Sequence, residues 1–165
     1  MSPIAWKIIL KRILAKDNLL MWGVTPTDSL LCVGGCSQPR EEMINHLFME
    51  CGFFSSTLNL VLHLLVVYTV LRADISSHAL QFGGAYAIKK DIQFRFQVIW
   101  LTCIWVIWKE RNSRIFSNKQ NSQNRLLECI KLHCWWWLNT YKLYFYFYFH
   151  SWWLNMSICI GYATL

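Results

Sequence analysis

Large apolar residues recur at helical spacing in the second half of the chain. One face of residues 92–117 carries Trp100, Ile104, Trp108 and Ile115. An α-helix turns once in about 3.6 residues, so this spacing gathers the large side chains into one stripe. The pattern predicts a single long helix over residues 92–117.

Shorter stretches of the same kind predict further helices. Three helices are predicted in the first half of the chain. They cover the amphipathic stretch 6–22, the stretch 41–50, which begins with two acidic residues, and the apolar stretch 53–72. A polar break at residues 118–123 separates the long helix from a last predicted helix over residues 124–139. The chain is therefore predicted to be mainly α-helical, with a small module followed by long apolar helices.

These patterns divide the chain into four segments. Residues 10–72 form the first module, and residues 73–91, with paired serines and paired glycines, are predicted to be a connector. Residues 92–139 form a helical extension. Residues 140–165 form an aromatic tail whose order the pattern leaves undefined, because the alternating Tyr and Phe from Tyr144 to Phe149 have high β propensity and no charge.

Four potential metal ligands lie close together in the first module. They are Cys32, Cys36, His46 and Cys51, with two glycines between the first two. Zinc prefers a tetrahedron of thiolate and imidazole ligands, and four protein ligands make the site structural. The alternative is a chance grouping, since the chain has seven Cys and five His. The glycine-rich turn and the close spacing favour a structural zinc site, and we expect zinc as the cofactor.

The same stretch, LLCVGGCSQPREEMINHLFMECGFF, resembles the zinc-binding domain at the C-terminal end of plant LINE-type (non-LTR) retrotransposon reverse transcriptases. The matching residues are Leu31-Cys32, Cys36, Glu41-Glu42, His46-Leu47-Phe48 and Cys51. Further along, the block IWVIWKERNSRIF resembles the C-terminal helix of that family. The chain departs from the family at Leu58, near the place where the family carries a Trp. The resemblance implies a retroelement-derived zinc module, with the polymerase domain of a parent retroelement as a possible partner.

Charge adds a second expectation. The net charge is +7, which suits a polyanion such as RNA or DNA, although a modest basic excess also aids solubility. The basic residues that we assign as a weak candidate interface with nucleic acid are Lys109, Arg111, Arg114, Lys119, Arg125 and Lys131. Hydrophobic residues make up 55% of the chain and there are ten Trp, so apolar faces packed against a partner protein are an alternative.

Catalytic patterns do not emerge from the sequence. The nine acidic residues are scattered, and there is no Tyr-x-Asp-Asp box, P-loop or nucleophile elbow. We therefore expect no enzymatic activity. No apolar run reaches the roughly 18 residues of a spanning helix, so a membrane role is a secondary alternative. The odd number of Cys and the absence of a secretory start predict an intracellular protein with reduced thiols.

Overall fold

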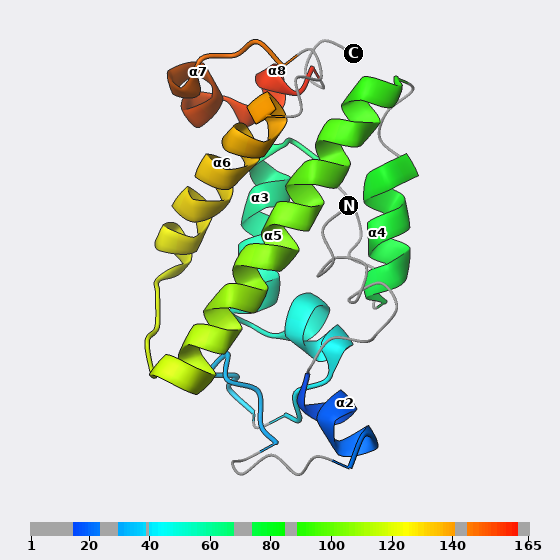
Figure 1. Ribbon diagram of the computed structural model, residues 1–165, viewed down its shortest axis with the longest axis vertical. Helices are drawn as coiled ribbons and strands as arrows, with labels where there is room; N and C mark the ends of the chain where they lie inside the picture. Colours follow the sequence, from blue (N-terminus) through cyan, green and yellow to red (C-terminus); the bar gives the residue numbers. More distant parts are fainter. Residues whose placement is uncertain are drawn as a thin grey trace.

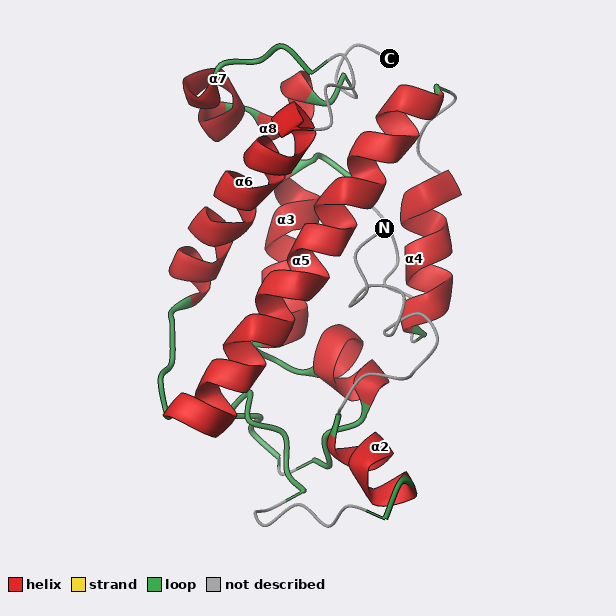
Figure 2. Ribbon diagram, in the orientation of Figure 1, coloured by secondary structure: helices red, strands yellow, loops and turns green. Residues whose placement is uncertain are grey.

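The computed structural model describes residues 15–23, 30–38, 40–67, 74–84, 89–140 and 145–161. Within these ranges every regular element is a helix, and the only extended pairing is an isolated antiparallel bridge between Leu31 and Glu41 (Figure 2). The predicted mainly helical fold is confirmed. In the described part of the chain, no helix combines the length and the apolar character needed to cross a membrane.

Two antiparallel helices, α5 (Lys90–Ser117) and α6 (Gln123–Thr140), form the centre of the fold (Figure 1). Both predicted helices are confirmed to within two residues at either end. Helix α5 ends at Asn118, which adopts the left-handed conformation with φ of 49°. This conformation stops the helix and turns the chain back towards α6.

The core is built from regularly spaced side chains on these helices. On α5, the predicted stripe is buried at Trp100, Ile104 and Trp108. On α6, a buried residue recurs every fourth position, at Leu126, Ile130, Cys134 and Leu138. Such a stripe follows one side of an α-helix, so α6 packs on its neighbours along its whole length.

Helix α3 (Phe54–Leu64) lies behind α5 in Figure 1 and contacts both α5 and α6. The sequence predicts a helix as far as residue 72, but the chain leaves the helix after Leu64, and Val66 has a positive φ of 56°. Residues 68–73 lie outside the described ranges. Leu58, near the place where the resembling family carries a Trp, is fully buried on α3.

Helix α4 (Ile75–Gly84) packs beside α5 within the segment predicted to be a connector. The sequence did not predict this helix. Trp100 donates a hydrogen bond from Nε1 to Nδ1 of the buried His78, at 3.0 Å. Burial lowers the pKa of His78 to about 4, so its ring is neutral and can accept this bond at neutral pH.

The two ends of the described chain differ from the predictions in length and type. Of the helix predicted over residues 6–22, the described part is α2 (Lys16–Met21), since residues 1–14 lie outside the described ranges. The tail forms two short helices, α7 (Phe149–Leu154) and α8 (Met156–Cys159), which pack near the end of α6. Trp152 anchors them, because its ring is fully buried and its Nε1 donates to the Lys131 carbonyl at 2.7 Å.

Candidate metal centre

Two of the four candidate ligands lie on a short hairpin-like loop. The backbone N–H of Cys32 donates to the Arg40 carbonyl at 2.8 Å, and the N–H of Glu42 donates to the Leu30 carbonyl at 2.9 Å. These bonds flank the Leu31–Glu41 bridge and close the loop that carries Cys32 and Cys36. The paired backbone of residues 30–32 and 40–42 therefore closes the loop that holds both thiols.

The other two ligands are brought together by a wide helical turn. Helix η1 (His46–Glu50) is wound as a π-helix, in which an N–H bonds to the carbonyl five residues earlier. The N–H of Cys51 makes this bond to the His46 carbonyl at 2.7 Å. A five-residue turn places His46 and Cys51 on the same side, facing the loop. The sequence predicts a helix over residues 41–50, but this start is wrong, because Glu41 pairs with Leu31 in the bridge and the helical residues begin only at Ile44. The wider winding of η1 was not predicted.

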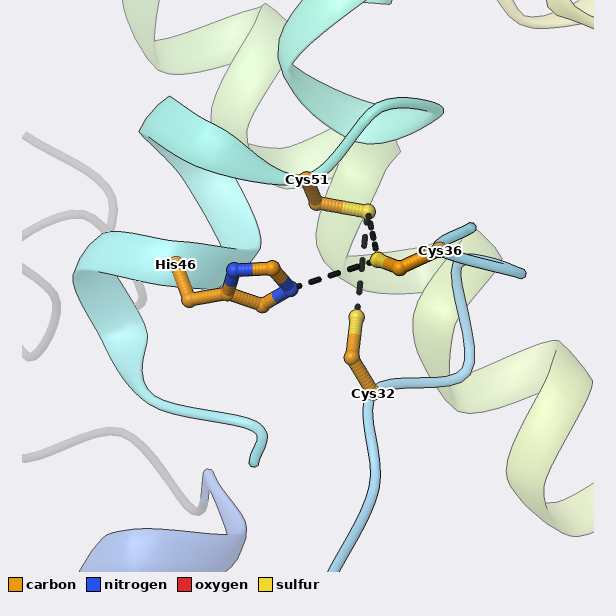
Figure 3. A group of neighbouring side chains, drawn as sticks. All are labelled: Cys32, Cys36, His46 and Cys51. Atoms are coloured by element: carbon orange, nitrogen blue, oxygen red, sulfur yellow. Dashed lines mark hydrogen bonds between the residues drawn. The ribbon is translucent and has the colours of Figure 1, made fainter. Parts of the chain in front are cut away.

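The four ligand atoms converge on one point (Figure 3). Cys36 Sγ lies 3.3 Å from His46 Nε2 and 3.6 Å from Cys51 Sγ. Cys32 Sγ lies 3.7 Å from Cys51 Sγ, and all four atoms lie within 4.8 Å of one another. Bond lengths of about 2.3 Å to sulfur and 2.0–2.1 Å to nitrogen give a zinc tetrahedron edges of about 3.5–3.8 Å. The two sulfur–sulfur distances of 3.6 and 3.7 Å fit these edges and the sulfur–nitrogen distance of 3.3 Å is slightly shorter, whereas the 4.8 Å limit exceeds the roughly 4 Å expected for a bound ion.

The chemistry of the donors also suits a divalent cation. The hydrogen bond from Cys32 lowers the pKa of Cys51 to about 5, and the backbone N–H groups of Phe53 and Phe54 act in the same direction. The same thiol pair and burial raise the pKa of Cys32, and burial raises the pKa of Cys36. Without an ion, Cys32 and Cys36 therefore hold their protons more tightly, whereas Cys51 is the thiol that ionises most readily. Zinc binding displaces such protons, and its two positive charges offset the thiolates.

Two arginine side chains of helix α5 contact the segment that carries Cys32 and Cys36. The Arg111 guanidinium forms a buried ion pair with Glu42, with Nε 3.0 Å from Oε1. Three residues along, Arg114 donates from Nη1 to the Val33 carbonyl at 3.1 Å, within the loop between the two thiols. Arg114 is itself held by Glu110, at 2.8 Å. The sequence gives no local signal for the contacts with Glu42 and Val33, because they join residues far apart in the chain. The pair with Glu110 is local, since the two residues lie four positions apart on one helix.

The six basic residues of the predicted nucleic-acid interface do not form one cluster. Arg111 and Arg114 are engaged inside the molecule, as described above. Lys131 donates to the Trp153 carbonyl at 2.9 Å, and Arg125 forms an exposed pair with Glu128 at 3.1 Å. Lys109 and Lys119 are exposed, with the Lys109 ammonium 4.6 Å from the centre of the Trp105 ring. The interface with nucleic acid stays a prediction.

Gly34 is a further residue that the ligand cluster requires. A Cβ atom at this position would lie 2.2 Å from Cys51 Sγ and 3.2 Å from the Phe54 ring. Only a residue without a side chain lets the loop approach the fourth ligand so closely. The sequence indicated that the glycines tighten the loop, but it did not identify this approach to Cys51.

We expect Gly34→Ala to weaken zinc binding, because the new methyl group displaces Cys51 Sγ. Overpacking of this kind costs about 1–3 kcal/mol, which corresponds to roughly 5- to 150-fold in affinity. Competition with a chromophoric chelator would measure the change. Gly52→Ala is the matched control, since a Cβ at Gly52 meets nothing within 4 Å. Equal zinc affinity of the two variants would contradict the prediction.

Comparison with known proteins agrees with the position of this cluster. Residues 1–57 match a family described as zinc-binding in reverse transcriptase. No curated protein and no solved structure matches the chain. The matching segment covers about a third of the 165 residues and includes all four candidate ligands. Residues 1–57 are thus similar to the zinc-binding segment of reverse transcriptases, and the Cys₃His cluster is suited to zinc.

Proposed function

We propose that this chain is a retroelement-derived accessory module of the plant LINE type, which binds nucleic acid and depends on one structural zinc ion. The observation that carries the proposal is the Cys₃His cluster inside the segment similar to reverse transcriptases. Zinc supplies structural cross-linking here, because four protein ligands complete its tetrahedron and leave no position for substrate or water. We therefore assign no catalytic step to this module.

The contacts with nucleic acid are proposed to come from exposed cations rather than from the metal ligands. Lys109 lies in the second half of α5, Lys119 in the loop after it, and Arg125 at the start of α6. These three side chains are exposed to solvent. Phosphate contacts need accessible cations, whereas Arg111 and Arg114 are held inside the molecule by Glu42 and Glu110. We propose the α5–α6 turn as the face that contacts phosphates.

Salt-dependent binding to single-stranded RNA and DNA tests this proposal. A double variant, Lys109→Gln with Lys119→Gln, should lower the affinity and reduce the slope of log Kd against log salt by about 1.4, since each phosphate contact on a single strand contributes about 0.7. Lys89→Gln with Lys90→Gln is the matched control, because both lysines are exposed and lie at the other end of α5. No binding at low salt, or equal slopes for both doubles, would refute the nucleic-acid role.

A second candidate function is packing on a polymerase domain of the parent element. Several large apolar side chains on α2 and near the metal loop are exposed, namely Leu20, Met21, Trp22, Leu31 and Met43. Exposed apolar residues of this size suit a protein partner better than a polyanion. Co-elution of the zinc-loaded chain with such a polymerase domain, at salt concentrations that abolish nucleic-acid binding, would favour this function over the first.

A further inference from the structure

The imidazole of His46 presents its two nitrogens to different surroundings. Nε2 lies 3.3 Å from Cys36 Sγ and points into the ligand cluster, as Figure 3 shows. Nδ1 is buried on the other side of the ring and has no hydrogen-bond partner. The Glu50 carboxylate lies close to this atom, with its Oε2 3.8 Å from Nδ1. This separation is less than about 1 Å longer than a hydrogen bond.

Arg40 connects Glu50 to the opposite part of the site. Its Nη1 lies 3.1 Å from the same Glu50 Oε2. Arg40 ends the hairpin-like loop that carries Cys32 and Cys36, whereas Glu50 belongs to η1, which carries His46. The chain Arg40–Glu50–His46 therefore spans the two backbone segments that supply the ligands.

We propose that Glu50 is a positioning residue for the metal centre: its carboxylate accepts the Nδ1–H of His46 and so directs Nε2 towards zinc, while Arg40 holds the carboxylate. A neutral imidazole carries one proton, so a proton on Nδ1 leaves the lone pair of Nε2 free for the metal. Carboxylates that accept this proton fix the ring orientation and make the ligand nitrogen more basic. The inference rests on the proposed occupation of the cluster by zinc.

If Glu50 formed only its surface ion pair with Arg40, it would not influence how His46 binds zinc. The side chains of Arg40 and Glu50 are 57% and 44% exposed, and exposed pairs contribute at most about 1 kcal/mol to stability. A loss of such a pair leaves the metal affinity almost unchanged. An outer partner of a ligating His is different, because its removal lowers metal affinity by about 10- to 100-fold. Zinc affinity thus separates the two roles.

The test uses the full chain and zinc itself, with affinity measured by chelator competition. Glu50→Ala should weaken zinc binding by about 10- to 100-fold, and Glu50→Gln should lose less, because its amide oxygen still accepts from Nδ1. Glu41→Ala is the matched control, since Glu41 is an exposed acid of the same module and its carboxylate makes no contact with His46. Affinity of Glu50→Ala within twofold of wild type, or equal losses for the Ala and Gln variants, would overturn the proposal.

Nitrogen NMR of the imidazole gives a second readout that does not depend on stability. The zinc-loaded wild type should show a protonated Nδ1 in slow exchange with water, and Glu50→Ala should show faster exchange of this proton. An unchanged exchange rate would overturn the role of Glu50. Failure of the wild type to bind zinc would instead refute the proposed function, so the two failures are distinguishable.

Discussion

Removal of zinc is expected to unfold residues 30–52 together. The only named helix in the described part of this segment, η1, has five residues, which is too short to be stable without tertiary contacts or a bound metal. Structural zinc contributes on the order of 10–16 kcal/mol in small finger peptides at neutral pH, which matches or exceeds the 5–15 kcal/mol stability of a typical domain. The ion therefore decides whether this segment folds.

The effect should extend into α5, although not along its whole length. Arg111 and Arg114 bind Glu42 and Val33 of the metal module, so the last turns of α5 lose these partners when the module unfolds. The earlier part of α5 packs instead on α4 and α6. We expect the first half of α5 and the length of α6 to keep their structure without metal.

Amide exchange with and without a chelator measures both parts of this expectation. Cys36→Ser should reproduce the effect of chelation on residues 30–52, because it removes one thiolate ligand. Cys129→Ser is the control, since Cys129 lies on α6 and outside the cluster. Equal protection of residues 30–52 in wild type, Cys36→Ser and chelated samples would show that no metal holds the segment.

The parts of the fold that could be predicted are those with local signals. The stripe through Trp100, Ile104 and Trp108 predicted α5, and the polar break before residue 124 separated it from α6. The four ligands were predicted from their spacing, because a small zinc site uses residues near one another in the chain. Each of these signals is contained in one short stretch of sequence, the longest being the 28 residues of α5.

The features that were missed depend on distant partners. Helix α4 has paired serines and glycines, which favour a connector, but packing on α5 through His78 and Trp100 outweighs this preference. Arg111 looked like a free cation because its partner Glu42 is 69 residues away, and the contact of Arg114 with the Val33 carbonyl spans 81 residues. The pair of Arg114 with Glu110, four residues away, is the exception that the spacing could have indicated. The position of a charged residue in the sequence does not show whether a residue from another segment pairs with it in the fold.

The ion pair between Arg111 and Glu42 is expected to carry the largest single-residue effect outside the ligands. Both side chains are almost fully buried, at 3% and 0% exposure, and Glu42 Oε2 already lacks a hydrogen-bond partner. Arg111→Met would leave the carboxylate buried without its countercharge. Breaking a buried pair in this way costs about 3–5 kcal/mol. Urea unfolding of the zinc-loaded protein should show this loss.

Two companion variants identify the cause of that loss. Replacing both partners, with Glu42→Met and Arg111→Met, should recover most of the stability, because removal of a whole buried pair is often neutral. Recovery should be incomplete, since the Lys16 backbone N–H also donates to Glu42, at 3.4 Å. Arg125→Met breaks the exposed pair with Glu128, whose side chains are 64% and 50% exposed, and should cost less than about 1 kcal/mol. An Arg111→Met variant as stable as Arg125→Met would show that α5 does not hold the metal module through this pair.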